Sequence, residues 1–160
     1  MATRTGNEYR RSLYTIWKRT TPPPDMTLFD MPGREVCALK RSRTDTPLQA
    51  LALLNDVTYL EASRVLAQRM LSKGGSTPAD RIAYAFRSAL ARAPSREETR
   101  ILAAGLERRL AKYRADADAA VKLISLGDTK RDPKLDPAVL AAYSITASTI
   151  LNLDETITRE

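Results

Sequence analysis

The sequence predicts an all-α protein of about five to seven capped helices, with a partly extended, proline-containing arm near the N-terminus. Three observations support this fold class. Helix-start signals recur along the chain, apolar residues repeat three and four positions apart, and no strand-like alternation accompanies a hairpin turn. The 160 residues, 43% hydrophobic and 28% charged, suit a single globular domain over 1–160.

Residues 8–19 are predicted to form a basic amphipathic helix. At about 100° per residue, apolar side chains occupy one arc and basic side chains the other. The two sets are Tyr9, Leu13, Ile16 and Trp17, and Arg10, Arg11, Lys18 and Arg19. The prolines at 22–24 end this helix, because proline lacks an N–H and restricts the residue before it. Residues 20–45 are then expected to be the extended arm, in which Glu35–Leu39 is the best strand candidate.

Residues 46–160 are predicted to be a helical bundle, because four helix starts occur there. Thr46-Pro47-Leu48-Gln49 has the pattern of a capping box with proline at the first helical position. Thr77–Asp80 and Ser95–Glu98 repeat the capping box, and Asp136 precedes Pro137 in the same way. The expected stops are glycines, namely Gly74, Gly75 and Gly127.

Apolar spacing agrees with these starts. The expected core positions are Leu48, Leu51 and Leu54; Leu60, Ala67, Met70 and Leu71; Ile82, Phe86, Ala89 and Leu90; Leu102, Leu106, Leu110 and Tyr113; Val121, Ile124 and Leu126; and Val139, Tyr143, Ala147, Ile150 and Leu151. The pair Asn55-Asp56 is expected to break or bend the first of these helices, and residues 127–136 to form a polar loop.

The composition excludes several kinds of chemistry. The chain contains no histidine, which removes Ser-His-Asp and Cys-His catalysis, histidine metal sites and haem ligation by a histidine of this chain. Its one cysteine, Cys37, excludes an intrachain disulfide and multi-cysteine zinc or iron–sulfur sites. Apolar runs such as Ala50–Leu54 are far too short to span a membrane.

Several motifs resemble one known family. They are Tyr9–Thr20 with the three prolines that follow, Arg41–Leu51, Leu54–Asp56, Ala85–Arg87, Leu151–Glu155 and Thr158–Glu160. In order and spacing they resemble the C-terminal part of the planctomycete PSD-one domain of unknown function. The resemblance implies that this chain is the C-terminal half of a larger domain. It also implies an exported or periplasmic parent protein with a cytochrome-c-like domain, whose haem is held outside this chain.

Basic residues concentrate near the N-terminus. Residues 1–43 hold nine Lys or Arg against four acidic residues, a net charge of +5 out of +7 for the chain. The candidate contacts to an anion or a partner are Arg10, Arg11, Lys18, Arg19, Arg41 and Arg43. An acidic polysaccharide fits this charge, whereas nucleic acid is disfavoured because no recognised binding motif is present. Pairing with acids of a missing half explains the same cluster.

Two further features invite a chemical interpretation. Cys37 lies among cations that would favour its thiolate, but a buried, inert thiol is the preferred interpretation. Asp128, Asp132 and Asp136 recur every fourth residue, whereas an EF-hand loop needs oxygen ligands at alternate positions and a central glycine. A solvated loop, with Asp136 as a helix cap, is therefore expected, and no metal or other cofactor is expected in this chain.

The chain is thus predicted to be a non-catalytic structural or interaction module that completes the C-terminal end of a larger protein. Its partner would be the upstream half of that protein, or a second copy. The contact would use an exposed apolar strip, formed either by Tyr9, Leu13, Ile16 and Trp17 or by the Met26–Met31 arm. The alternative from another class is a basic module that binds anionic polymers.

One ion pair is also predicted. If the last helix continues past Leu153, Asp154 lies in the middle of its apolar arc. A buried carboxylate needs a partner, so Asp154 is expected to pair with Arg11 or Arg43 and to join the two ends of the chain. The alternative is that the helix ends near Leu153 and leaves Asp154 in solvent.

Overall fold

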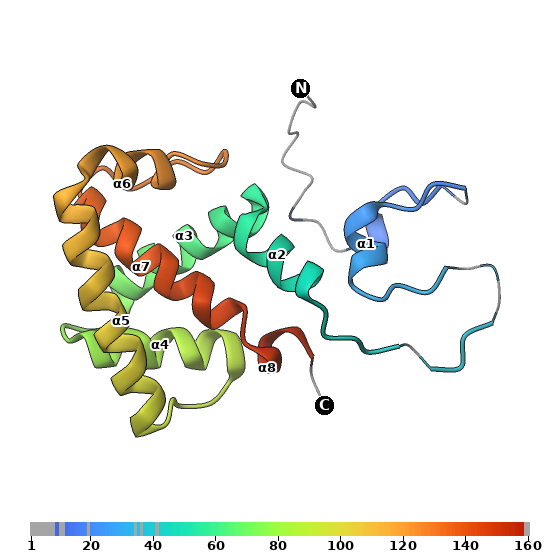
Figure 1. The fold of residues 1–160 in the computed structure, drawn as a ribbon, viewed down its shortest axis with the longest axis horizontal. Helices are drawn as coiled ribbons and strands as arrows, with labels where there is room; N and C mark the ends of the chain where they lie inside the picture. The colour runs from blue at the N-terminus through green and yellow to red at the C-terminus, as the bar shows by residue number, and fades with distance from the viewer. Residues whose placement is uncertain are drawn as a thin grey trace. The chain divides into compact units, whose positions relative to one another are not determined.

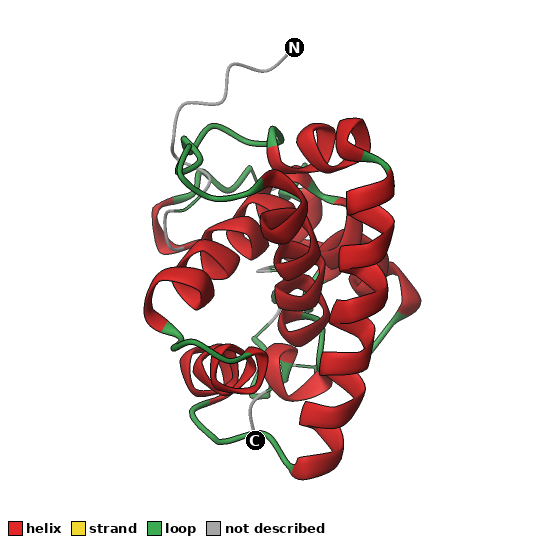
Figure 2. Cartoon of the chain, turned by 90° about the vertical axis from the view of Figure 1, so that its left-hand side faces the viewer, coloured by secondary structure: helices red, strands yellow, loops and turns green. Residues whose placement is uncertain are grey.

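The computed structural model describes residues 9, 12–18, 20–33, 35, 37–40 and 42–158. Over these residues the chain forms eight α-helices and one 3-10 turn, and its only strand-like feature there is the isolated bridge between Lys18 and Thr21. Figure 2 shows this helical content. The all-α fold predicted from the sequence is confirmed, with more helices than expected because two short ones, of five and four residues, add to the count.

The chain separates into two compact units, residues 1–52 and 53–160. The helices, labelled in Figure 1, are α1 (Pro24–Leu28), α2 (Pro47–Asn55), α3 (Val57–Lys73), α4 (Pro78–Leu90), α5 (Arg96–Ala115), α6 (Ala117–Ile124), α7 (Pro137–Leu151) and α8 (Asp154–Ile157). The 3-10 turn η1 covers Ser12–Tyr14.

The predicted helix starts are confirmed. Thr77 and Ser95 form reciprocal capping boxes at α4 and α5, and the Asp136 carboxylate accepts from the Val139 N–H at the start of α7. The break expected at Asn55-Asp56 is also present, because Asp56 accepts from the backbone N–H of Thr58 and so caps α3.

The first segment differs from the sequence prediction. Within 8–19 the structure describes the turn η1 and non-helical residues at 15–17, where an amphipathic helix was expected. The reason is that Leu13 and Ile16 are exposed, and a short helix without a packed apolar face is marginal in water. The arm expected over 20–45 is not extended throughout either. It contains α1, because Pro24 occupies the first helical turn, where a missing N–H costs nothing.

Of the remaining expected elements, the strand is absent from the described residues and the helix near residue 121 is present. None of the described residues of Glu35–Leu39 is in a strand. The helix marked by Val121, Ile124 and Leu126 is α6, which begins after Asp116 caps it through the N–H of Ala119; of the three, Ile124 is buried. In the described part of the chain, no helix combines the length and apolar character that crossing a membrane requires.

The core of the second unit is built around α7. This helix is apolar or small on every side, and most of its residues are buried. It packs against α3, α5 and α6, with further contacts to α4 and α8. Figure 1 shows α7, in red, passing between these helices. Phe86 of α4, Met70 of α3 and Ile124 of α6 are fully buried in the same core.

A buried charge pair ties the loop after α6 to α3. The Glu61 carboxylate accepts from the backbone N–H groups of Asp128 and Thr129, and the Arg64 guanidinium donates to the Thr129 carbonyl at 2.6 Å. Glu61 and Arg64 also form an ion pair at 3.6 Å, and both are almost fully buried. Gly127 has φ +89° where it passes the Glu61 side chain, and a Cβ there would overlap that carboxylate.

We expect Gly127→Ala to destabilise the second unit by about 3 kcal/mol or more, because it adds backbone strain and displaces a buried, paired carboxylate. Gly75→Ala is the matched control, since Gly75 has φ +91° but its Cβ would lie 3.0 Å from the exposed Asp80 side chain, a tight contact that a small shift relieves. The control should cost about 1 kcal/mol, mainly from backbone strain. Urea unfolding followed by circular dichroism compares the two, and equal losses would contradict the role assigned to the Glu61 contact.

Candidate docking surface

A hydrogen-bond network in the first unit fixes the arm against α2. The Asp30 carboxylate accepts from the Thr44 N–H at 2.7 Å and from the Thr44 hydroxyl at 2.8 Å. The Gln49 amide donates to the Leu28 carbonyl at 2.8 Å and to the Thr44 hydroxyl at 3.2 Å. Gln49 also closes the predicted capping box with Thr46, so this one buried side chain joins α1, the arm and the start of α2.

Asp30 adopts a left-handed backbone conformation, with φ +57°. Few residues other than glycine do so readily, and aspartate is among those that tolerate it. The turn lets the chain reverse after α1, and the Met31 N–H donates to the Met26 carbonyl at 3.0 Å. The local strain is offset by the two bonds from Thr44, fourteen residues away.

An open pocket of about 290 Å³ lies beside this turn. Its lining is Thr27, Asp30, Met31, Pro32, Gly33, Ala38, Lys40 and Ser42. The walls are mixed, with methionine and proline surface next to two hydroxyl groups, one ammonium group and the Asp30 carboxylate. This carboxylate is already engaged by Thr44, so the pocket suits weak polar contacts with a docked side chain better than acid–base chemistry.

Large apolar side chains are exposed in the same unit. Leu48 and Leu51 of α2 are 63% and 57% exposed. Gln49 is the one buried residue of this strongly apolar helix. Further exposed apolar residues of the unit are Tyr9, Leu13, Tyr14, Ile16 and Leu39. We call Leu48 and Leu51, the exposed leucines of α2 within this unit, the α2 leucine surface.

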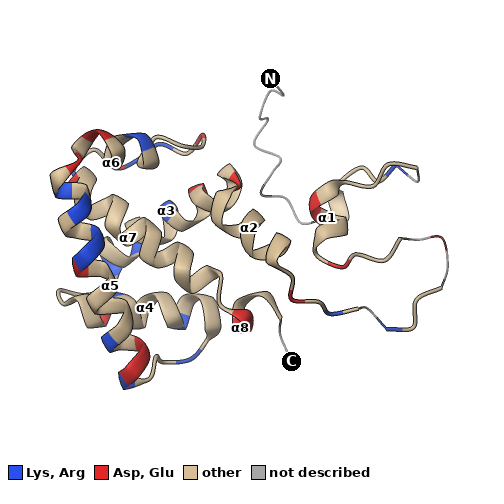
Figure 3. Cartoon of the chain, in the orientation of Figure 1, with Lys and Arg blue, Asp and Glu red and all other residues tan. Residues whose placement is uncertain are grey.

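The basic residues predicted as anion or partner contacts are only partly visible. Lys18 and Arg43 are exposed, as expected for such contacts. Arg10, Arg11, Arg19 and Arg41 lie outside the described residues, so the convergence of the six on one face stays a prediction. Figure 3 shows the distribution of charged residues along the described chain.

The interpretation of Cys37 needs correction, and that of the aspartate loop is supported. Cys37 is exposed, not buried, because its segment lies on the surface of the small first unit. Asp128 and Asp132 are exposed, and Asp136 caps α7. No group of three or more carboxylate or thiol side chains in the described part of the chain is placed to hold a metal ion.

The burial predicted for Asp154 is wrong. The helix α7 ends at Leu151, so Asp154 does not continue its apolar arc; it opens α8, is exposed, and accepts from the Thr158 hydroxyl at 2.8 Å. Pairing of Asp154 with Arg11 or Arg43 stays untested, without the burial that motivated it, and Arg11 lies outside the described residues.

Its neighbour Glu155 forms an ion pair instead. Arg92, between α4 and α5, donates to Glu155 at 2.7 Å and to Glu98 at 2.7 Å, and its guanidinium stacks over the Phe86 ring at 5.2 Å. Hydrogen bonds from Arg92 are the largest cause of the lowered pKa of both carboxyls, which falls to about 2 at Glu98. Glu98 also accepts from the Ser95 N–H, so one arginine links α8 to the capping box of α5.

Comparison with protein families gives one match. Residues 1–106 match PSD1, described as a protein of unknown function (DUF1553). The chain belongs to this family. The match spans the arm, α2 to α4 and the first half of α5, and thus the whole α2 leucine surface; the resembling motifs at Leu151–Glu155 and Thr158–Glu160 lie beyond it. Neither the curated proteins nor the solved structures gave a match to this PSD1 chain.

The sequence predicted part of this surface of the PSD1 chain. The motif Thr46–Gln49 predicts the capping box. The hydrogen bond from Gln49 to Leu28 joins residues 21 positions apart, so no pattern of neighbouring residues predicts it. The leucines of α2 were expected in the core, because their spacing indicates a helical face without saying what covers it. Exposed apolar surface is predicted at Tyr9, Leu13, Ile16 and Trp17, of which the first three are exposed. The alternative was the Met26–Met31 arm, whose apolar side chains are half-buried.

We expect Gln49→Met to loosen the arm, because a side chain of similar size cannot replace the bonds to Leu28 and Thr46. Amide hydrogen exchange at Thr44 and Thr46 should speed up by about tenfold, equivalent to one lost hydrogen bond. The control is Gln68→Met, which removes a bond from the Asp132 N–H in the second unit. Unchanged exchange at Thr44 and Thr46 in the Gln49 variant would contradict the anchoring role of Gln49.

We expect the second unit to lose stability as the pH falls from the ordinary glutamate pKa of 4.5 toward about 2, where Glu98 becomes protonated. A lowered carboxyl pKa stabilises the fold above 4.5, and that contribution disappears as the proton binds. Glu98→Gln keeps the acceptor for the Ser95 N–H but removes the charge, so the difference in urea midpoint between about pH 6 and about pH 3 should shrink. Glu107→Gln, at an exposed site on α5, is the control and should retain the full difference.

Proposed function

We propose that this PSD1 chain is a non-catalytic interaction module that docks onto the upstream part of a larger protein through the α2 leucine surface. The observation that carries the proposal is the exposure of Leu48 and Leu51 in a helix whose one buried residue is a glutamine. Each fully buried leucine contributes about 1.5–3 kcal/mol to an association, so leaving such a surface in water is costly unless something covers it.

The docked segment is expected to be apolar with acidic flanks. The exposed cations Lys18, Lys40 and Arg43 belong to the same unit as the leucines, and residues 1–43 carry a net charge of +5. Apolar residues opposite the leucines would supply affinity, and carboxylates opposite the cations would supply orientation. The network of Asp30, Thr44 and Gln49 supports this role because it holds the arm and α2 in one conformation before binding.

The family resemblance suggests the setting. The larger protein would be an exported one with a cytochrome-c-like domain, in which haem is held by residues outside this chain. In that setting the chain completes the C-terminal end of its parent. The rival function is a basic module that binds anionic polysaccharide through the exposed cations of the first unit.

The test is co-purification of the chain with the upstream part of a PSD1 protein, using Leu48→Ser/Leu51→Ser as the variant. Removing two buried leucines should weaken the complex by about 100-fold. The control is Ile101→Ser, since Ile101 is an exposed apolar residue of α5 in the second unit. The double variant should fold as well as the wild type, because exposed apolar side chains contribute little to folding.

Two outcomes would contradict the proposal. One is a wild-type chain that does not bind the upstream part; the other is equal binding by the double variant and the wild type. Heparin retention tests the rival, and loss of retention on Lys18→Gln/Arg43→Gln, with unchanged retention on Leu48→Ser/Leu51→Ser, would favour polymer binding.

A further inference from the structure

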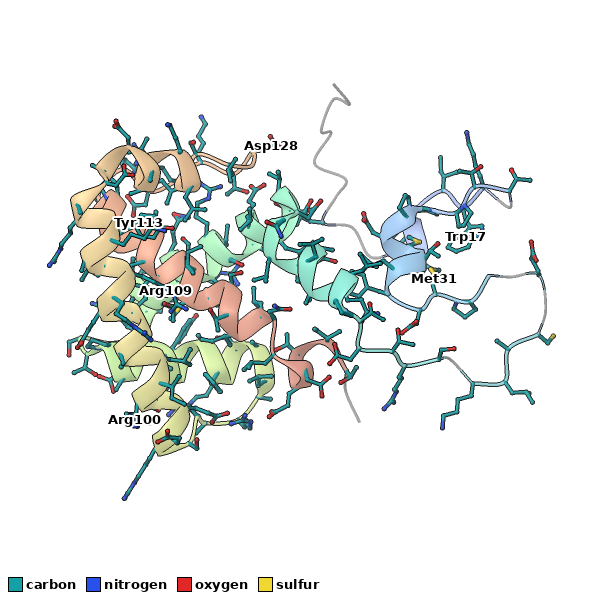
Figure 4. All side chains as sticks on the ribbon, in the orientation of Figure 1. Trp17, Met31, Arg100, Arg109, Tyr113 and Asp128 are labelled. Carbon is teal, nitrogen blue, oxygen red and sulfur yellow. The ribbon has the colours of Figure 1, made fainter. Side chains whose placement is uncertain are left out.

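Arg109 of the second unit bonds only to neutral oxygens among the described residues, unlike Arg64 and Arg92 of the same unit. Arg64 pairs with Glu61, and Arg92 pairs with Glu98 and Glu155. Arg109 belongs to α5 and is half-buried against α7. It makes no ion pair with any described residue. Its guanidinium donates instead to the Thr146 and Thr149 hydroxyls of α7, each at 3.3 Å. Figure 4 labels Arg109 on α5, on the side toward α7.

The two threonines do not compensate the charge of Arg109. Thr146 donates its own proton to the Ala142 carbonyl and Thr149 donates to the Ile145 carbonyl, each at 2.9 Å. Their oxygens therefore present lone pairs to the guanidinium but carry no negative charge. Burial and the charge of the adjacent Arg108 both lower the pKa of Arg109, which indicates a cation that lacks a counter-charge.

The position of the guanidinium is set by its surroundings. Gly105, one turn before it on α5, leaves room for the head group, and a Cβ there would lie 3.0 Å from Nη1. A guanidinium has five N–H donors, of which the threonines take two. Its Nε makes no hydrogen bond to a described residue and is not among the buried atoms that lack a partner, so this N–H is open to solvent.

Tyr113 adds a neutral donor to the same helix face. It lies four residues after Arg109, one turn along α5, and packs partly buried against the core. Burial raises the pKa of its hydroxyl, so the proton stays on the oxygen near neutral pH. Basic residues dominate this half of α5, with Arg108, Lys112 and Arg114 nearby in the sequence (Figure 3).

We propose that Arg109, with Tyr113, is a binding site for a carboxylate group on the α5–α7 seam. A carboxylate matches the site because its two oxygens accept from neighbouring N–H groups of one guanidinium in a single plane. The carboxylate belongs either to a small organic acid or to an acidic side chain of a partner. The site lies in the second unit and is independent of the docking function proposed for the α2 leucine surface.

The experiment is an NMR titration of the full chain that follows the Arg109 Nε–Hε signal. The probes are glutarate, a Glu-rich decapeptide and, as the anion control, chloride at equal ionic strength. Saturable shifts with glutarate or the peptide are expected, and Arg109→Gln should weaken binding of that probe by about tenfold or more. In the variant, binding is followed on the backbone amides of Thr146 and Thr149.

The matched control is Arg108→Gln, which removes an adjacent exposed charge but no bond to α7. It should keep affinity within about threefold, as a surface charge contributes little. Arg109→Lys keeps the charge without the planar fork and should bind with intermediate affinity, which separates recognition from a change in stability.

The outcomes distinguish the sources of the carboxylate. Binding of glutarate indicates a small organic acid, and binding of the peptide without glutarate indicates an acidic side chain of a partner. Shifts no larger than those with chloride would overturn the proposal, and so would equal losses in Arg108→Gln and Arg109→Gln. Neither result bears on the docking of the α2 leucine surface, which is tested by other variants.

Discussion

The second unit depends on one constraint, which is that α7 must be enclosed on every side. Its sequence carries no charged residue, and its buried positions are distributed around the whole helix. The other helices therefore pack around it, with α3, α5 and α6 in the most extensive contact. Its hydroxyl groups are compatible with burial because Ser144, Thr146 and Thr149 donate to carbonyls one turn earlier in the same helix.

Packing around α7 takes charged side chains partly or wholly out of water, and the fold accommodates them in two different ways. Glu61 and Arg64 are taken out of water together, and backbone groups of the loop after α6 bond to both of them. That loop leads into α7, so the pair also directs the helix into the core. Arg109 also lies against α7 but finds only neutral oxygens there. The first arrangement pairs opposite charges and serves the fold, whereas in the second the positive charge has no negative partner among the described residues.

The first unit is held together by hydrogen bonds more than by an apolar core. It has little apolar core of its own, and hydrogen bonds through Asp30, Thr44 and Gln49 hold its arm to α2. Polar networks of this kind fix a conformation without covering apolar area, which leaves the leucines of α2 exposed. A helix such as α2, held in one conformation but apolar on its surface, is suited to association with a partner. The family match covers residues 1–106 and so includes the whole first unit.

The sequence by itself determined the helical class, four capped starts and the break at Asp56, because caps and turns depend on residues within one helical turn of each other. It could not decide which apolar faces are covered. The leucines of α2 and those of α5 have the same spacing, yet the former are exposed while Leu102 and Leu106 are buried. Nor could it place Glu61 against residues 128 and 129, or Arg109 against Thr146, or end α7 before Asp154. Contacts between residues more than thirty positions apart are set by how the helices pack around α7. Helical periodicity shows which residues share a face of a helix, but not which distant residues that face will contact.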